Sequence, residues 1–482
     1  MKVFVSILFI LAIFFNVLYL NDGHNWGDDF AQFIINARNI IEGKPYSSGI
    51  MFDNIVSCPP GLPLMLAPIL KIFGLNFKLL KSLNILCWYG GILFLYNLLL
   101  RSTSAPFALM SALFLAFSSF FFIFKQNVLS DIPFFLFVCS SLYAFECWKR
   151  NSSKAQGRLF FILFLFSMSA ALWVRLAGSI LFISAVLYFL FIERDIKALV
   201  AVLAVSLINA IILFLWMGWH PGFWIEVGQN HLAFLNGAFN NFGTVFQSLW
   251  YFFCPSQTVF SRCLFNLMEP VVSCLAPFIY SMMVWSFIQG FRKNSLSYIE
   301  CFSFFYMSLL ILWSAITLSP DAFARYTLPL LPFVFISFWR LLVFVKRFNL
   351  DLNALARVVF LVLLLINATN VFIVRDFNDN VFSLPEISEM IAWVNQNTKP
   401  DEHFMYWKPR ALALLTHREG AAPWIYPDQQ RHFMQRVKDF KITYVISLKY
   451  NDTQGLTPQL EANKQFKVVW ENVLYKIFKF VN

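Results

Sequence analysis

The chain has 482 residues, of which 59% are hydrophobic and only 13% are charged, and 60 of them are Phe. One soluble core cannot bury that much apolar surface, so the composition excludes the soluble globular classes. The formal net charge of +11 raises the question of nucleic acid, but the basic residues gather in short loops between apolar runs, which is typical of membrane topology. We therefore predict a polytopic α-helical membrane protein with no nucleic-acid partner.

Apolar runs long enough to cross a bilayer core, about 17–22 residues each, recur along residues 1–374 and define a transmembrane domain. They predict about 11 transmembrane helices: Val3–Leu20, Leu83–Leu100, Pro106–Phe124, Ile132–Trp148, Leu159–Val174, Ala177–Ile192, Ala198–Met217, Val271–Ile288, Tyr298–Leu318, Tyr326–Val345 and Ala356–Val374. An odd number of spans puts the two termini on opposite sides of the membrane. The Lys and Arg residues of the loops after the fourth and tenth spans predict a cytoplasmic N-terminus.

A polar and acidic loop, residues 21–82, follows the first span and is expected on the outer side. Its centre holds two adjacent acids, Asp28 and Asp29, which either belong to a site, lie in a solvated loop or cap a helix predicted over Phe30–Ile41. Farther along, Leu62–Phe73 is apolar, contains two prolines and is too short to span, so we predict an interfacial helix. Three lysines near it are expected at headgroup level: Lys71, Lys78 and Lys81.

Further charged residues lie at the outer ends of predicted spans. Asp131 begins the fourth span, where the structural alternative is a helix cap made by Ser130 or Asp131, with Pro133 in the first turn. Arg325 and Tyr326 begin the tenth span, although Arg at a helix N-terminus opposes the helix dipole. An anionic partner such as a lipid phosphate would offset that cost, and a headgroup anchor is the alternative. Arg175 lies inside an apolar stretch and is either a second phosphate ligand or the partner of a loop carboxylate.

Two stretches have a different character from the spans. The loop Trp219–Pro255 is rich in aromatic residues, which suit sugar stacking, and contains His231, a weaker substrate-binding candidate. Residues 375–482 have ordinary polarity and no spanning run, with a helical period over Glu386–Asn395 and an apolar strand pattern over Lys441–Ser447. The terminal FKVVWENVLYKIFKF alternates around a Glu-Asn turn like a hairpin. We predict a small α/β domain on the extracytoplasmic side.

Several short strings, in their order and spacing, resemble one known family: Gly27-Asp28-Asp29, Ala37–Tyr46, Cys58–Pro63, Ser130–Pro133 and Arg325–Pro329. They are similar to the GT-C glycosyltransferases that use polyprenyl-phosphate sugars, in the branch with protein O-mannosyltransferases and the lipid A aminoarabinose transferase. The resemblance implies an inverting transferase of a bacterial inner membrane. It also implies a catalytic carboxylate at Asp28 or Asp29, a second acid at Asp131 and a substrate-binding aromatic at Tyr326.

The chemistry of such a transferase needs few groups. A carboxylate must take the proton of the acceptor hydroxyl, and cations must stabilise the departing phosphate. Of the two adjacent acids, we favour Asp28 as the base. The aminoarabinose transferase carries Glu-Lys, associated with metal and lipid phosphate, where this sequence has Ser57-Cys58. Without Glu-Lys at this position, no cofactor is certain, although a divalent metal stays possible. The expected phosphate contact then moves to Arg325, Lys71 or Lys78.

The predicted partners are a polyprenyl-phosphate sugar donor, a lipid, glycan or protein acceptor, and membrane lipids. The main alternative is a transporter or flippase of lipid-linked glycans, which should carry ionisable residues or broken helices near mid-bilayer, often in repeated halves. Acids at helix ends and a sequence without repeats favour the transferase. A non-catalytic scaffold would leave the acidic loops unexplained. The sequence indicates neither the sugar nor the acceptor.

Overall fold

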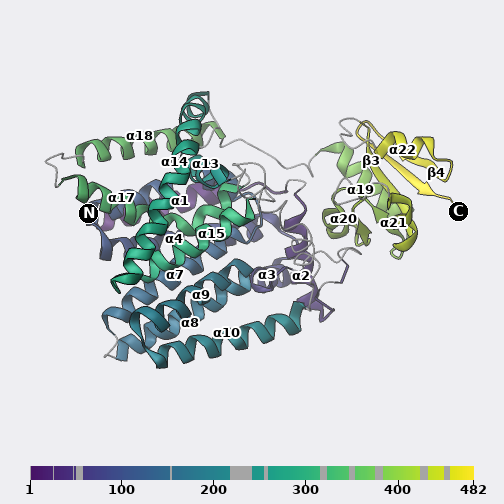
Figure 1. The fold of residues 1–482 in the computed structure, drawn as a ribbon. Helices are drawn as coiled ribbons and strands as arrows, with labels where there is room; N and C mark the ends of the chain where they lie inside the picture. Colours follow the sequence, from purple (N-terminus) through teal and green to yellow (C-terminus); the bar gives the residue numbers. More distant parts are fainter. Residues whose placement is uncertain are drawn as a thin grey trace. The chain divides into compact units, whose positions relative to one another are not determined.

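The computed structural model of the chain divides into two compact units (Figure 1). We call the first the helical unit (Met1–Leu20, Ser82–Gln126 and Ser130–Phe377) and the second the mixed unit (Asn21–Lys81, Asn127–Leu129 and Asn378–Asn482). The structure describes residues 2–24, 27–46, 48–49, 58–151, 155–217, 242–253, 259–314, 323–346, 353–374, 384–423, 432–449 and 456–481.

The helical unit is built from apolar helices joined by short connections. Its described elements are α1 (Lys2–Leu18), α4 (Phe77–Ser102, whose first residues belong to the mixed unit), α5 (Ala105–Ala116), α6 (Ser119–Phe124), α7 (Asp131–Arg150), α8 (Ala155–Val174), η1 (Leu176–Gly178), α9 (Ser179–Leu187), η2 (Tyr188–Glu193), α10 (Ile196–Met217), α13 (Phe242–Phe253), α14 (Val259–Arg292), α15 (Tyr298–Trp313), η3 (Arg325–Leu330), α17 (Leu331–Lys346) and α18 (Asn353–Val374).

Each predicted span overlaps one of these helices or consecutive helices, and the end of the span Tyr298–Leu318 lies outside the described residues. Among the described residues, seven helices are both long and apolar enough to cross a membrane. The fold class is therefore confirmed, whereas the number of eleven spans stays a prediction. One helix was not predicted: α13 lies within the stretch Trp219–Pro255, whose position as an outer loop stays a prediction. The 12 residues of α13 are too few to cross a bilayer core, so no apolar run predicted a helix there.

Helix α7 is the most buried of the spanning helices, and it packs along α8. The Phe145 ring centroid of α7 lies 5.3 Å from that of Phe164 on α8 and 4.5 Å from that of Tyr298, the first residue of α15. Helix α10 instead exposes most of its apolar side chains, with Leu215 75% exposed. An exposed face of that size is explained by contact with lipid rather than water.

The mixed unit begins with two helices from the first loop, α2 (Asp29–Glu42) and α3 (Gly61–Phe73), which pack against each other. The 13 residues of α3 extend roughly 20 Å, which is less than a bilayer core. Its last turn exposes Lys71, Ile72 and Phe73, in agreement with the predicted interfacial helix. Lys81 is fully buried, and its Nζ donates to the carbonyl oxygens of Asn21 and Gly23. Its predicted headgroup position is therefore wrong, because the loop carbonyls provide the polar partners.

The remainder of the mixed unit is a five-stranded sheet with the strand order β2-β1-β3-β5-β4. The strands are β1 (His403–Met405), β2 (Gly420–Ala421), β3 (Ile442–Leu448), β4 (Phe466–Glu471) and β5 (Tyr475–Phe480). The first three pair in parallel, and β5 pairs antiparallel with both β3 and β4. The predicted strand and terminal hairpin are thus confirmed.

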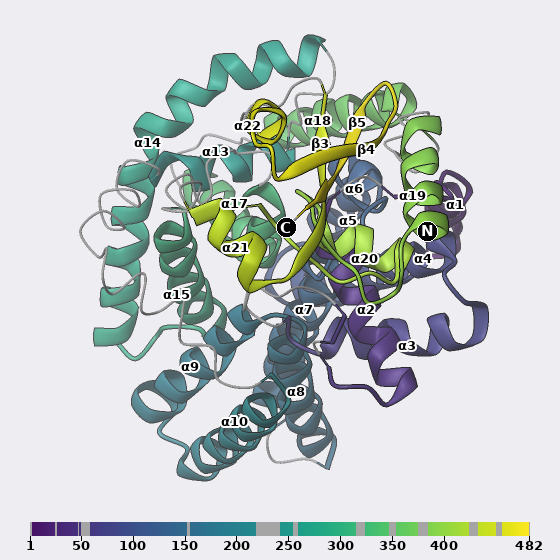
Figure 2. The same ribbon diagram turned by 90° about the vertical axis from the view of Figure 1, so that its right-hand side faces the viewer.

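Helices cover both faces of this sheet (Figure 2). Helices α19 (Pro385–Asn397) and α20 (Pro409–Thr416) cover one face, and α21 (Phe433–Asp439) and α22 (Leu456–Ala462) cover the other. Successive residues of β3 alternate between the two cores: Val445 packs with α21 and α22, and Ile446 packs with α19 and α20. This alternation is the period of two that predicted the strand.

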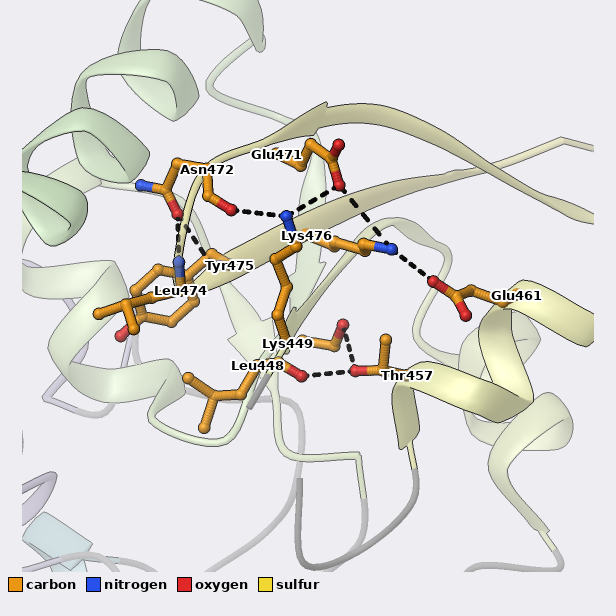
Figure 3. Close-up of polar contacts among 10 residues, drawn as sticks. Leu448, Lys449, Thr457, Glu461, Glu471, Asn472, Leu474, Tyr475 and Lys476 are labelled. Atoms are coloured by element: carbon orange, nitrogen blue, oxygen red, sulfur yellow. Dashed lines mark hydrogen bonds and ion pairs between the residues drawn. The ribbon is translucent and has the colours of Figure 1, made fainter. Parts of the chain in front are cut away.

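Polar contacts fix the hairpin turn between β4 and β5 (Figure 3). The Asn472 side-chain oxygen accepts hydrogen bonds from the backbone N–H groups of Leu474 (3.0 Å) and Tyr475 (2.9 Å), as Asn does in many turns. The Lys449 ammonium donates to the Asn472 carbonyl at 2.8 Å and pairs with Glu471 at 3.1 Å. These contacts tie the end of β3 to the turn and set the register of the hairpin.

Candidate functional site

The acidic pair Asp28–Asp29 lies at the start of α2 in the mixed unit. Asp28 occupies the N-cap position of α2, but its side chain makes no capping bond there. Instead, its Oδ1 accepts the backbone N–H groups of Arg410 (3.1 Å) and Ala411 (3.0 Å), in the first turn of α20. The predicted alternative of a cap on its own helix is therefore wrong. Asp28 caps a helix that lies about 380 residues later in the chain.

Arg410 contacts both acids. Its Nη1 lies 3.1 Å from Asp29 Oδ1, and its Nε lies 3.5 Å from Asp28 Oδ2. The side chain of Arg410 is 11% exposed and that of Asp28 is 18% exposed, whereas that of Asp29 is 58% exposed. Burial raises the pKa of Asp28 above its usual value, although Arg410 and the Ala411 N–H favour the carboxylate. Asp29 thus presents the more accessible carboxylate of the pair.

The opposite end of α20 also contacts α2. The Arg38 guanidinium donates to Nδ1 of His417 at 3.1 Å, so this nitrogen is the acceptor of a neutral imidazole. His417 has a φ of 56° at the C-cap of α20. The Cys58 thiol lies in the same unit, and burial raises its pKa to about 12, which argues against a nucleophilic role.

The helical unit contains a second cluster, made of four residues that the sequence singled out. Asp131, the first residue of α7, is 3% exposed and forms an ion pair with Arg175. The guanidinium carbons of Arg175 and Arg325 lie 4.7 Å and 4.8 Å from the centre of the Tyr326 ring. Arg325 also donates to the Tyr326 hydroxyl at 2.8 Å. We call these four residues the Arg–Tyr cluster.

Local structure explains how these side chains meet. Helix α8 ends at Val174, and Arg175 has an extended backbone before the short turn η1. The turn closes tightly at Gly178, where an added Cβ would lie 2.4 Å from the Leu172 backbone nitrogen. Tyr326 lies on η3, and its carbonyl accepts a hydrogen bond from the hydroxyl of Tyr306, a buried residue of α15, at 2.9 Å. Sequence reasoning missed Tyr306, since a Tyr inside an apolar span carries no local signal.

The Arg–Tyr cluster combines two guanidinium groups with one carboxylate and one phenol. Guanidinium groups match the geometry of phosphate oxygens, and both of these groups contact the Tyr326 ring. The sequence left two roles open for Arg175, a phosphate ligand or the partner of a carboxylate, and the ion pair with Asp131 corresponds to the second. The predicted cap at this helix is not made by Ser130, whose side chain forms no capping bond.

The other sequence candidates lie apart from these clusters. Lys71 is exposed at the end of α3, and Lys78 is half exposed with its Nζ 2.8 Å from Asp22 Oδ1. His231 lies outside the described residues. Within the described part of the chain, no group of three or more His, Cys, Asp or Glu side chains could hold a metal ion. At the acidic pair, Arg410 already contacts both carboxylates, so this donor set fits a guanidinium better than a metal.

Arg410 is the main residue that sequence reasoning missed. It belongs to a stretch of ordinary polarity, where an Arg attracts no notice. One local signal existed: α20 begins with Pro409 after Lys408, and no side chain at that position caps the helix. Its first N–H groups therefore need an acceptor from elsewhere, but nothing local points to Asp28.

Comparisons with known proteins agree with this architecture. Residues 57–219 match the sequence profile of a family described as dolichyl-phosphate-mannose-protein mannosyltransferase. The structure is similar to ArnT from Cupriavidus metallidurans in the apo state (14% identity, 99% of this chain and 98% of that chain covered, TM-score 0.55). It is also similar to ArnT from the same organism bound to undecaprenyl phosphate (14%, 98% and 97%, TM-score 0.56).

A third similar structure is the archaeal oligosaccharyltransferase AglB from Archaeoglobus fulgidus, in complex with an inhibitory peptide and a dolichol-phosphate (14%, 93% and 69%, TM-score 0.53). No curated protein sequence matches the chain significantly. At these identities the structural likeness establishes the fold. The matched segment 57–219 contains Asp131 and Arg175, and the acidic pair precedes it.

Proposed function

We propose that this chain, a membrane glycosyltransferase with the GT-C fold, moves a sugar from a polyprenyl-phosphate carrier to a lipid, glycan or protein acceptor on the extracytoplasmic face. The observation that carries the proposal is the Arg–Tyr cluster, in which Arg175 and Arg325 contact one aromatic ring and Asp131 pairs with Arg175. Two guanidinium groups beside an apolar helical wall suit a lipid phosphate.

In the proposed reaction, the acceptor hydroxyl attacks the anomeric carbon of the sugar and loses its proton to a carboxylate. The bond between that carbon and the phosphate oxygen breaks, and the polyprenyl phosphate leaves with the bonding electron pair. We assign the base to Asp29, whose 58% exposed side chain is accessible to an acceptor. Asp28, which we favoured from the sequence, uses Oδ1 to cap α20 and is less exposed.

The Arg–Tyr cluster is assigned to the leaving phosphate. Arg325 and Arg175 would stabilise the charge that develops on it, and Asp131 would hold Arg175 in place. Lys71 and Lys78 remain candidates for contacts with lipid phosphate at the membrane surface, because both are exposed. His231 keeps its weaker assignment to substrate binding.

We further propose a topology for this enzyme. Residues 1–374 form the transmembrane domain with its first outer loop at residues 21–82, and residues 375–482 form the extracytoplasmic α/β domain. The N-terminus is cytoplasmic and the membrane is a bacterial inner membrane. The distribution of Lys and Arg between the loops supports this orientation. The flippase alternative is not supported, because the matching family and AglB are described as transferases.

A transfer assay tests the proposal directly. Purified protein in proteoliposomes would receive a panel of radiolabelled undecaprenyl-phosphate hexoses and pentoses, together with membrane lipid and protein acceptors. We expect label from at least one donor in a new glycosidic product. Redistribution of intact donor across the bilayer, with no product from any sugar, would instead identify a flippase and contradict the proposal.

Arg325→Gln should lower kcat/KM in this assay by about 100- to 1000-fold, the usual loss when one group that stabilises developing charge is removed. Arg340→Gln is the matched control, since Arg340 pairs with Glu300 in the same unit and is 57% exposed. Equal activity of both variants would remove Arg325 from the site.

A further inference from the structure

We propose that the guanidinium of Arg410 takes the place of a divalent cation at the acidic pair Asp28–Asp29 and positions Asp29 for the transfer. The positioning role rests on the proposed function. The occupation of the acidic pair by Arg410 follows from contacts within the mixed unit and can be tested without any transfer assay.

The contacts account for three of the four carboxylate oxygens. Asp28 Oδ1 accepts two backbone N–H groups of α20, and Asp28 Oδ2 lies 3.5 Å from Arg410 Nε. Asp29 Oδ1 lies 3.1 Å from Arg410 Nη1. Among the described residues, Asp29 Oδ2 makes no such contact. One carboxylate oxygen is therefore left for a proton, on the more exposed of the two acids.

A guanidinium in this position competes with a metal ion for the same oxygens. A hard divalent cation needs several oxygen ligands, and here two of the oxygens face Arg410 and a third accepts backbone N–H groups. A cation added beside Arg410 would also meet its positive charge, and that of Lys408, which acts on Asp28 as well. Arg410 is only 11% exposed, and a movement away from the pair would leave Asp28 Oδ2 without its ion pair in a largely buried position.

The backbone of α20 fixes where Arg410 stands. The helix begins at Pro409, its first N–H groups are bonded to Asp28, and its last residue is followed by His417, which contacts Arg38 of α2. Both ends of α20 are thus held against α2. The guanidinium consequently orients Asp29 from a fixed helix, in the way that an outer-shell partner orients a metal-ligating carboxylate.

Binding of Mn²⁺, measured by electron paramagnetic resonance on the purified full-length protein, tests the occupation. We expect wild type and Asp29→Asn to bind the same amount of Mn²⁺, because Arg410 keeps the ion from the acidic pair in wild type. Arg410→Gln should gain a Mn²⁺ site, and the double variant Arg410→Gln/Asp29→Asn should lose it again. A wild-type Mn²⁺ site that disappears in Asp29→Asn would overturn the proposal, and so would an Arg410→Gln variant without any gain.

Transfer activity tests the positioning role. Wild type should keep its activity in excess EDTA, and Arg410→Gln should lose about 10- to 100-fold, the range seen when a partner of a reactive group is removed. Arg410→Lys should recover part of that loss, and millimolar Mn²⁺ should raise the activity of Arg410→Gln but not that of wild type. Loss of wild-type activity in EDTA that added Mn²⁺ restores would contradict the proposal.

Arg418→Gln is the control for a purely structural effect. Arg418 lies just beyond the other end of α20 and donates to the carbonyl oxygen of Thr398 at 2.8 Å. Its loss should loosen the domain without creating a Mn²⁺ site, and an equal Mn²⁺ response in this variant would refute the role of Arg410. Should no sugar be transferred by any variant, the proposed function fails, while the Mn²⁺ measurements still decide whether Arg410 occupies the pair.

Discussion

At the scale of single residues, Asp28 and Asp29 are adjacent in the sequence but differ in their surroundings. Asp28 accepts backbone N–H groups of α20, whereas Asp29 is 58% exposed and has one contact with Arg410. We therefore expect Asp29→Asn to lower kcat by about 100- to 10,000-fold, the usual contribution of a general base. Asp28→Asn should keep much more activity, since an amide oxygen can still accept the two N–H groups.

Steady-state transfer by both variants, together with their expression and thermal stability, checks this difference. An inactive but stable Asp28→Asn beside an active Asp29→Asn would reverse the assignment of the base. Asp28→Ala serves as a third arm. It removes the acceptor altogether and should cost about 1 kcal/mol of stability as the lost cap of α20.

The sequence identified single functional candidates only where a charged residue lies beside or inside an apolar segment. Asp131, Arg175 and Arg325 could be identified because a charge beside an apolar span is costly and needs a reason. The structure brings these residues together around Tyr326. Arg410 could not be identified in this way, because it lies in a stretch where charged residues are ordinary.

At the scale of elements, the packing of α20 on α2 should depend on pH. Burial lowers the pKa of His417 below its usual value of about 6.5, and Arg38 lowers it further, with Arg418 and Lys44 adding to this and Glu42 opposing it. As the pH falls, His417 therefore binds a proton at a higher pH in the unfolded segment than in the folded one. The contribution of neutral His417 to stability is present above about pH 6.5 and is lost as the pH falls toward the folded pKa.

Amide hydrogen exchange of α20 at about pH 7.5 and about pH 5.5, corrected for intrinsic rates, measures this effect. We expect faster exchange at the lower pH in wild type and a smaller change in His417→Asn. Asn is a suitable control because it tolerates the left-handed conformation at a φ of 56° and does not titrate in this range. An identical pH response in the two proteins would show that another group is responsible.

Elements with a strong period or a long apolar run were predicted well, and short ones were not. The strand β3, the hairpin β4–β5 and helix α19 follow from alternation and helical period. Helix α13 was missed, because its 12 residues lie in an aromatic stretch that is too short to span and was read as a loop. Lys81 was misplaced for a related reason: its carbonyl partners belong to a loop without regular structure.

At the scale of the whole molecule, hydropathy predicts the fold class, because a bilayer admits few architectures and long helices are the commonest of them. Hydropathy did not predict which segments of the chain form the mixed unit. This unit joins the first loop to the C-terminal residues through contacts such as Arg38–His417, across 379 residues of sequence. Local patterns carry no information about which distant segments pack together.

The proposed topology makes a prediction about the entire chain, since it assigns every site residue to one side of the membrane. A reporter fused after Val374 should be extracytoplasmic: alkaline phosphatase should be active there and green fluorescent protein dark. Lys149 and Arg150 lie in the last turn of α7, and this positive charge predicts that the loop between α7 and α8 is cytoplasmic. Fusions in that loop should therefore give the opposite pair of signals. If the fusion after Val374 fluoresces, the number of spans before it is even. The C-terminal domain would then lie on the side opposite to the one predicted for Asp28, although Arg410 of that domain contacts Asp28, and the proposed topology would be contradicted.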